Sequence, residues 1–355
     1  MGGVTRPVVL VTGAGGFIGG WMAEALYLSG WAKVRAGVGR WSSAARIARF
    51  PMDIVQCDVM DRVSVNDAVA GADVVIHCAR GRGDDSPVTE CGARYLLDSA
   101  ARAGVRHFIY LSSVAVYGEA TGLLTEDSPP VGMVTAYGAG KRRAEAICEQ
   151  FASERLSVSV IRPTLVYGPF SEQWTLPFIA RLATGKWRKL GPGGEGKCNL
   201  VYVGDLVRMA QFLVEADLGP MNVFHGNGPD TPTWNEYIET FNEMLGFPPL
   251  EETRYDLRLT TALNAPIRGL GKHLMAHHRD LVLGVANRAP DLKDLLRRLE
   301  ADMRLRPNQD DVVRFATDVT YSMDRAKAAG FSPATDMHRG LALTVDWARG
   351  MGLAN

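Results

Sequence analysis

Apolar residues in the first half of the chain come in short runs that alternate with longer amphipathic stretches. Pro7 to Thr12 is a continuous apolar run, as a strand buried on both faces requires, and Gly16 to Ser29 follows with an apolar helical face. The same alternation continues to Arg162 and predicts strands with helices between them. The expected strands are Pro7–Thr12, Lys33–Val38, Asp53–Cys57, Asp73–Cys78, His107–Ser112 and Ser157–Arg162, and the expected helices are Gly16–Ser29, Cys91–Ala103 and Ala139–Glu154.

This alternation is typical of an α/β chain in which helical crossovers join parallel strands. We therefore expect a Rossmann fold, a doubly wound parallel sheet, over residues 1–167. After Pro163 proline and glycine become dense, and helical patterns at Leu206–Ala216 and Asn235–Leu245 stand among loops. We expect residues 168–355 to form mainly a smaller C-terminal substrate-binding lobe, with some segments returning to the Rossmann sheet.

The segment Tyr255–Arg306 has the weakest pattern. Pro290 and Asp291 are typical of a helix start, and the leucines that follow them share one helical face. His273 and His277 stand four residues apart, a spacing that metal ligands use, but no carboxylate completes a set. We interpret the part that begins at Pro290 as a packed helix and the histidines as part of a solvated helix face, so we expect no metal site.

Composition excludes several classes of function. The 39 basic residues balance the 39 acidic ones, which gives no reason to expect nucleic acid or an anionic membrane as a partner. The five cysteines are scattered without a CxxC pair, so neither a disulfide framework nor a zinc site is predicted. No signal-peptide pattern and no bilayer-length apolar run occurs, and we expect a cytoplasmic protein. Nothing in the sequence specifies the oligomeric state, for which a homodimer is the working expectation.

A glycine-rich segment connects the first strand to the first helix. It reads Thr12-Gly-Ala-Gly-Gly-Phe-Ile-Gly19, with glycines spaced G-x-x-G-x-x-G. A tight turn of this kind lets backbone N–H groups approach a pyrophosphate at the N-terminus of the helix. We therefore predict a site for NAD or NADP, and its expected residues in this segment are Gly13, Gly16, Phe17, Ile18 and Gly19.

A serine, a tyrosine and a lysine are the candidate catalytic residues. Tyr137 and Lys141 lie four residues apart and share a helix face, and Ser113 follows the expected fifth strand. An isolated tyrosine titrates near about 10, too high for a base at neutral pH, but a neighbouring ammonium favours the phenolate. Tyr137 can then exchange a proton with a substrate oxygen that Ser113 hydrogen-bonds, while both Tyr137 and Lys141 contact the cofactor.

These motifs resemble those of the extended short-chain dehydrogenase/reductase superfamily, in its NAD-dependent epimerase/dehydratase branch. The resemblance covers Val8 to about Glu251 and resumes near Tyr321. It implies that Asp58 and Val59 contact the adenine ring, that Ala79 lines the cofactor path, and that Pro163 lies beside the nicotinamide. The matching residues are Thr12–Gly19, Asp58–Val59, His77–Ala79, Leu111–Gly118, Tyr137–Lys141, Arg162–Pro169, Val201–Asp205 and Met323–Pro333.

The end of the second strand departs from the family pattern. Relatives that prefer NAD place an acidic residue there to bind the ribose 2′-hydroxyl, and this chain has none. Arg40, with Ser42 or Ser43 and with Arg35 as a further candidate, can hold a 2′-phosphate instead. The alternative is that Arg40 is a solvated loop charge. The missing acid favours NADP over NAD.

Two further departures concern the chemistry. Thr89 stands where relatives carry an asparagine that supports the lysine through water, which puts that proton relay in doubt. Val114 and Ala115 follow Ser113 where sugar 4,6-dehydratases have Asp and Glu, so we expect no dehydration. Epimerase or ketoreductase chemistry on a nucleotide sugar is the leading function. The alternatives are an NADPH-dependent reductase or dehydrogenase of a small non-sugar metabolite and, more remotely, a non-catalytic NAD(P)-binding regulator.

Overall fold

A computed structural model describes residues 6–81, 86–185, 187–252, 307 and 309–354. The chain divides into two compact units. Unit 1 comprises Met1–Ser171, Asn199–Asp230 and Val319–Gly340, and unit 2 comprises Glu172–Cys198, Thr231–Asp318 and Leu341–Asn355. The chain therefore enters unit 2 and returns to unit 1 twice. The helix expected from Pro290 and the histidine pair His273 and His277 lie outside the described residues.

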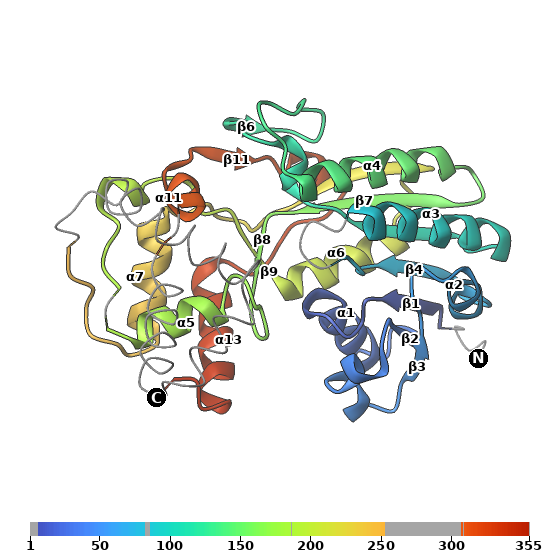
Figure 1. Ribbon diagram of the computed structural model, residues 1–355, viewed down its shortest axis with the longest axis horizontal. Helices are drawn as coiled ribbons and strands as arrows, with labels where there is room; N and C mark the ends of the chain where they lie inside the picture. The colour runs from blue at the N-terminus through green and yellow to red at the C-terminus, as the bar shows by residue number, and fades with distance from the viewer. Residues whose placement is uncertain (1–5, 82–85, 186, 253–306, 308, 355) are drawn as a thin grey trace, which may run out of the picture. The chain divides into compact units, whose positions relative to one another are not determined.

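Unit 1 is built on a seven-stranded sheet in which every neighbouring pair is parallel. The strand order is β10-β7-β5-β4-β1-β2-β3, so the chain starts in the middle of the sheet and winds outward in both directions (Figure 1). This is the doubly wound Rossmann arrangement that the sequence predicts. The strands are β1 (Val8–Thr12), β2 (Lys33–Val38), β3 (Asp53–Gln56), β4 (Val74–His77), β5 (His107–Leu111), β7 (Ser157–Pro163) and β10 (Met221–Gly226).

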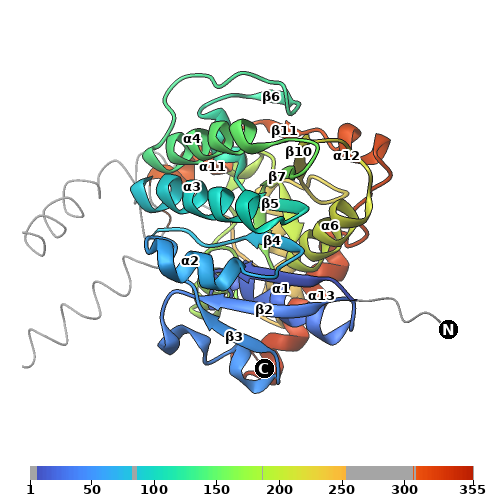
Figure 2. The ribbon, with the colours of Figure 1, turned by 90° about the vertical axis from the view of Figure 1, so that its right-hand side faces the viewer.

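Helices cover both faces of this sheet (Figure 2). Apolar residues of α1 and α6 form the core on one face, and those of α2, α3 and α4 form the core on the other. Burial on both faces explains the continuous apolar runs Val8–Val11 of β1 and Val74–Ile76 of β4. The helices are α1 (Phe17–Leu28), α2 (Arg62–Val69), α3 (Ser86–Ala103), α4 (Ala136–Phe151), α6 (Val203–Glu215) and α12 (Asp324–Ala328).

Short elements complete unit 1. The strand β6 (Gly122–Leu124) pairs with β11 (Val319–Tyr321), and β8 (Leu165–Tyr167) pairs with β9 (Leu200–Tyr202), both in parallel. Single turns of 3₁₀ helix follow two of the large strands. These turns are η1 (Trp41–Ala44) with η2 (Ile47–Arg49) after β2, and η3 (Val114–Tyr117) after β5.

Unit 2 is helical in its described part and has an aromatic core. The Trp234 ring stacks on Phe178 at 6.2 Å and contacts Phe315 at 4.7 Å, measured between ring centroids. The elements are α5 (Leu176–Ala183), η4 (Gly191–Gly194), α7 (Trp234–Met244) and α11 (Gln309–Ala316), and α13 (Met337–Gly350) runs from unit 1 into unit 2.

The expected elements of the Rossmann half are confirmed, with ends that differ by up to a few residues. The helix expected at Cys91 begins at Ser86, and the one expected at Ala139 begins at Ala136. The short helix α2 and the edge strand β10 are absent from the expectation. β10 lies almost sixty residues after β7, its sheet neighbour, and only the tertiary register of Val158 with Met221 identifies it as part of the sheet.

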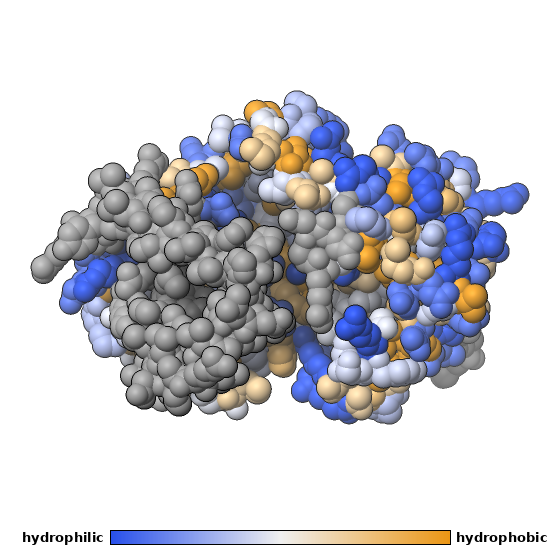
Figure 3. Space-filling model, viewed as in Figure 1, coloured by the Kyte–Doolittle hydropathy of each residue, from blue (hydrophilic) through white to orange (hydrophobic). Residues whose placement is uncertain are grey.

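Hydrophilic residues are interspersed with apolar ones on the visible face of unit 1 (Figure 3). Among the described helices, none combines the length and apolar character that crossing a bilayer requires. All five cysteines are free thiols, and three of them are buried.

Candidate active site

The loop between β1 and α1 forms a tight backbone cradle. Gly13 has a φ of 69°, a conformation that residues with a Cβ rarely adopt. A Cβ at Gly19 would lie 2.3 Å from the Gly13 carbonyl oxygen, so glycine is what allows α1 to pack this closely on the loop. The Gly16 N–H donates to the same carbonyl oxygen at 2.9 Å and closes the turn. The geometry leaves backbone, rather than side chains, facing the place where a pyrophosphate would lie.

The first turn of α1 adds an electrostatic preference for an anion. Its N-cap is Gly16, which makes no side-chain capping bond, and no acidic residue lies in the first turn. The N–H groups around Phe17 and Ile18 therefore keep the partial positive charge of the helix N-terminus. A dinucleotide pyrophosphate fits this cradle both sterically and electrostatically.

The end of β4 packs directly against the glycine loop. A Cβ added to Gly13 would lie 2.7 Å from both the Cα and the backbone nitrogen of Ala79. The half-buried Ala79 is thus adjacent to the cradle, where the sequence expects the cofactor path. Asp58 is exposed, and its carboxylate accepts a hydrogen bond from the Met60 N–H at 3.0 Å. Val59 is buried against α3, and its expected contact with adenine stays a prediction.

The candidate ligands for a 2′-phosphate near the end of β2 differ in their contacts. Arg35 is bound elsewhere: its guanidinium forms an ion pair with Asp53 at 3.0 Å and donates to the Ala68 and Ala70 carbonyl oxygens. Ser43 turns its hydroxyl toward the Arg40 carbonyl oxygen, 2.6 Å away. The Arg40 side chain itself is exposed and has no partner among the described residues. Arg40 therefore remains the available cation at this strand end, whereas Arg35 does not.

Ser113, Tyr137 and Lys141 meet at the carboxyl end of β5. Ser113 is the N-cap of η3, where its hydroxyl oxygen accepts from the Ala115 N–H at 3.1 Å. Tyr137 and Lys141 lie in the first turns of α4, and the Ser113 hydroxyl lies close enough to Tyr137 to lower the pKa of its phenol. The Lys141 ammonium donates to the Leu111 carbonyl oxygen at 2.5 Å and lies 6.0 Å from the centroid of the Tyr137 ring. The sequence-predicted set is therefore assembled in one place.

Burial and charge act on both titrating groups of this set. Burial lowers the pKa of Lys141 to about 8, because the ammonium loses its hydration. Burial raises the pKa of Tyr137, while the hydrogen bond from Ser113 and the positive charge of Arg80 act in the opposite direction. The Lys141 ammonium also lies 4.7 Å from the centroid of the Tyr110 ring, a cation–π contact that stabilises the charged form.

A series of buried polar contacts that sequence reasoning missed begins at Ser112, next to Ser113. Ser112 donates to Glu145, and Glu145 forms an ion pair with Arg162 at 2.7 Å. Arg162 donates to the Tyr117 hydroxyl oxygen at 2.7 Å, and that hydroxyl meets His225 Nε2 at 2.6 Å. Glu145 lies four residues after Lys141 on the same helix, which is the one signal in the sequence that could have pointed to it.

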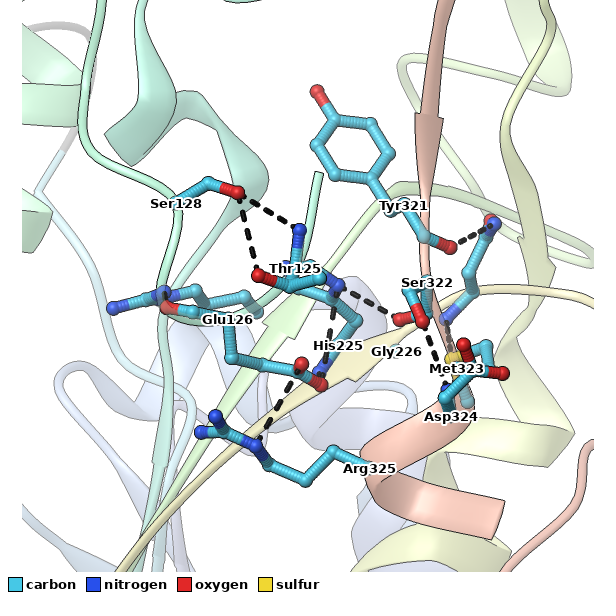
Figure 4. Close-up of polar contacts among 12 residues, drawn as sticks. Thr125, Glu126, Ser128, His225, Gly226, Tyr321, Ser322, Met323, Asp324 and Arg325 are labelled. Atoms are coloured by element: carbon cyan, nitrogen blue, oxygen red, sulfur yellow. Dashed lines mark hydrogen bonds and ion pairs between the residues drawn. The ribbon is translucent and has the colours of Figure 1, made fainter. Parts of the chain in front are cut away.

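This series of polar contacts ends at His225, whose own contacts Figure 4 shows. Its Nδ1 lies 2.9 Å from the Ser322 carbonyl oxygen, which can only accept, so Nδ1 carries the hydrogen and Nε2 accepts from Tyr117. Burial lowers the pKa of His225, although the nearby Glu126 carboxylate opposes this. Glu126 in turn accepts from the His225 N–H at 3.0 Å and lies 3.8 Å from Arg325. These contacts join the ends of β5, β7 and β10 to the β6–β11 pair.

Pro163 and Thr89 are the two remaining residues that the sequence singles out. Pro163 is the last residue of β7 and is in register with Gly226 of β10. It therefore lies at the carboxyl edge of the sheet, as its expected role beside the nicotinamide requires. Thr89, in the place of the family's asparagine, is buried on α3.

Residues 9–223 match the family described as "NAD dependent epimerase/dehydratase family". The chain is 29% identical over 242 residues to the N-acetyl-alpha-D-glucosaminyl-diphospho-ditrans,octacis-undecaprenol 4-epimerase of Escherichia coli, covering 64% of this chain and 68% of that protein. It is 30% identical over 240 residues to the UDP-glucose 4-epimerase of Neisseria gonorrhoeae, covering 56% of this chain and 70% of that protein. It is 30% identical over 210 residues to cinnamoyl-CoA reductase 1 of Oryza sativa, covering 51% of this chain and 60% of that protein.

Solved structures show the same fold at lower identity. The UDP-glucose 4-epimerase of Thermotoga maritima, solved with UDP-glucose, aligns with a TM-score of 0.71 at 21% identity, over 97% of this chain and 99% of that one. The UDP-glucuronic acid 4-epimerase of Bacillus cereus, solved with NAD, aligns with a TM-score of 0.69 at 17% identity, over the same shares. At these identities the likeness is one of fold.

Proposed function

This chain belongs to the NAD-dependent epimerase/dehydratase family, and from that premise we propose its reaction. We propose that it transfers hydride at a secondary alcohol or ketone of a nucleotide sugar, as an epimerase or a ketoreductase. The observation that carries the proposal is the assembly of Ser113, Tyr137 and Lys141 beside the glycine cradle. The sugar 4-epimerases among its relatives support a sugar substrate.

Each catalytic side chain has a separate task. The Ser113 hydroxyl donates a hydrogen bond to the substrate oxygen and holds it against Tyr137. The Tyr137 hydroxyl gives its proton to that oxygen in reduction and takes it back in oxidation. The Lys141 ammonium, fixed by the Leu111 carbonyl oxygen, lowers the cost of the phenolate that this exchange creates. When bound, the nicotinamide cofactor supplies the hydride acceptor or donor.

The cofactor is proposed to lie along the carboxyl edge of the sheet. Its pyrophosphate meets the backbone of Gly13, Gly16 and Gly19 and the helix start at Phe17 and Ile18. Asp58 and Val59 flank the adenine, and Ala79, Tyr137, Lys141 and Pro163 line the nicotinamide half. For the choice between NAD and NADP, Arg40 is the exposed cation available to a 2′-phosphate, and no acidic side chain ends β2 to repel one.

A specific observation favours a second candidate. If Arg40 binds a 2′-phosphate, the cofactor is NADP(H). NADPH-dependent net reduction of a small non-sugar metabolite then becomes the alternative function. The similarity to a cinnamoyl-CoA reductase supports this candidate. Dehydration is disfavoured because Val114 and Ala115, which follow Ser113 in η3, carry no acid to eliminate water.

Three features of organisation are part of the same proposal. Residues 168–355 supply mainly the substrate-binding lobe, the assembly is a homodimer, and the protein works in the cytoplasm. The compact unit that begins at Glu172 supports the first of these. Light scattering of the purified protein tests the second, because a monomer mass at micromolar concentration contradicts it.

The test of function is product analysis with a matched inactive variant. The protein is incubated with UDP-glucose or UDP-N-acetylglucosamine and with NAD, NADP, NADH or NADPH. An epimerase forms the 4-epimer without net change in nicotinamide absorbance, whereas a reductase or dehydrogenase changes the absorbance in step with product. Tyr137→Phe is the control for contaminating activity. Tight cofactor binding without turnover of any sugar or small ketone would instead indicate a regulator.

A further inference from the structure

Arg80 occupies a position from which it can reach the reacting groups. It lies three residues after β4, the strand that stands between β1 and β5 in the sheet. The preceding residue, Ala79, packs its backbone against Gly13 of the cofactor cradle. Because parallel strands end at the same edge, the Arg80 backbone emerges between the glycine loop and the β5 end that carries Ser113.

The Arg80 side chain is available to a ligand. It is exposed, and it has no hydrogen-bond or ion-pair partner among the described residues. Arginines in the nearby series of polar contacts differ in this respect, since Arg162 is bound by Glu145 and Tyr117, and Arg325 lies against Glu126 and Asp127. An arginine guanidinium recognises carboxylate and phosphate groups through paired N–H donors.

The charge of Arg80 acts on the catalytic pair. Besides the larger effect of burial, the positive charge of Arg80 lowers the pKa of both Tyr137 and Lys141. Two cations, Arg80 and Lys141, thus lie close enough to repel each other, and the described structure places no anion against Arg80. A bound anion next to Arg80 relieves that repulsion and is held near the oxygen on which Tyr137 acts.

We propose that Arg80 is a specificity-determining residue that binds an anionic group on the substrate, a carboxylate on the ring carbon next to the reacting carbinol carbon. This inference rests on the proposed function, because it assumes that Tyr137 exchanges a proton with the reacting oxygen of the substrate. It narrows the substrate class to acidic sugars of the uronic type. The cofactor pyrophosphate is the competing source of an anion, and the experiment separates the two.

The experiment measures binding and turnover with a matched pair of probes, UDP-glucuronic acid and UDP-glucose. Wild-type protein, Arg80→Gln and a control variant, Arg106→Gln, are compared at one salt concentration. Arg106 is also an exposed arginine, but it precedes β5 at the opposite, amino edge of the sheet. Dissociation constants are measured by calorimetry with NAD present, and NADH binding is measured separately by fluorescence.

The expected result is that wild-type protein binds UDP-glucuronic acid about 10-fold or more tightly than UDP-glucose, on the scale of a charge-assisted contact. Arg80→Gln should abolish this preference and leave NADH binding unchanged, and Arg106→Gln should keep it. Three outcomes overturn the inference: no preference in wild-type protein, a preference that survives in Arg80→Gln, or a loss of NADH binding in Arg80→Gln, which assigns Arg80 to the pyrophosphate. Turnover of UDP-glucose by wild-type protein without any preference for UDP-glucuronic acid would refute this inference while supporting the proposed function.

Discussion

Gly138 of α4 lies directly against the carbonyl oxygen of Ala115 in η3, so that a Cβ at Gly138 would be only 2.2 Å from that oxygen. The contact is backbone to backbone and leaves no flexible side chain to move aside. It docks the helix that carries Tyr137 and Lys141 onto the turn that begins at Ser113. The geometry of the candidate catalytic residues therefore depends on Gly138, which has no side chain to take part in the chemistry.

Gly138→Ala should consequently weaken both stability and catalysis. Forcing a methyl group into this contact should cost about 1–3 kcal/mol of unfolding free energy and separate Tyr137 from Ser113. We expect kcat to fall about 10-fold or more, because small misplacements of a catalytic group are costly. Gly350→Ala is the control, since a Cβ there meets nothing within 4 Å. Unchanged kcat and urea midpoint in Gly138→Ala would show that the helix has room to move.

Tyr137→Phe should abolish turnover and spare cofactor binding. The phenylalanine ring fills the same space but cannot exchange a proton with the substrate oxygen. The expected loss in kcat is about 10²-fold or more, the scale of a general acid–base group. NADH fluorescence titration should give the wild-type dissociation constant. Tyr95→Phe on α3 is the matched control, and equal activity of the two variants would remove Tyr137 from the mechanism.

The pH dependence of ketone reduction should report the ammonium of Lys141. Both Tyr137 and Lys141 must be protonated in this direction, and burial lowers the pKa of Lys141 to about 8. The ammonium is present below that pH and is lost above it, so kcat/KM should decline as pH rises through about 8. Lys141→Met should have low activity that lacks this decline of kcat/KM with rising pH. The exposed Lys33→Met should keep the decline. A profile that is flat from pH 7 to 9.5 contradicts the assignment.

Buried histidines should make unit 1 sensitive to acid. Burial lowers the pKa of His107 to about 4, and its Nε2 lies 2.9 Å from the Ser159 hydroxyl. The unfolded histidine takes up a proton near pH 6.5 and the folded one does not, so stability is complete above pH 6.5 and falls as pH decreases toward 4. The slope is about 1.4 kcal/mol per pH unit for each such group. His107→Asn should flatten the slope in urea unfolding between pH 7 and 5, whereas the exposed His338→Gln should not.

Arg40→Ala tests the cofactor preference. A guanidinium–phosphate contact contributes roughly 1.5–3 kcal/mol, which corresponds to about a ten- to hundredfold difference in affinity. Wild-type protein should bind NADP(H) at least as well as NAD(H), and the variant should lose affinity for NADP(H) far more than for NAD(H). Arg106→Ala controls for the change in net charge. A strong wild-type preference for NAD(H), or equal losses for both cofactors, would show that Arg40 is a surface charge, and a tightly retained NAD for epimerisation would then be favoured.

The amino-acid sequence by itself determined the Rossmann half and the identity of its key groups. Continuous apolar runs such as Val8 to Val11 identify strands buried on both faces, because a polar side chain there would need a buried hydrogen-bond partner. The glycines after Thr12 and the four-residue spacing of Tyr137 and Lys141 are local patterns, since a turn or a helix face is set by residues near in sequence.

Only the tertiary structure decided which distant groups meet. Arg40 and, after it, Arg35 are both phosphate candidates in the sequence, but the strand register places Arg35 beside Asp53, which binds its guanidinium. The path from Glu145 through Arg162 and Tyr117 to His225 joins residues up to 108 positions apart. Such contacts depend on how strands pair and helices dock. Those are set by burial summed over the whole core rather than by the local periodicity that a sequence displays.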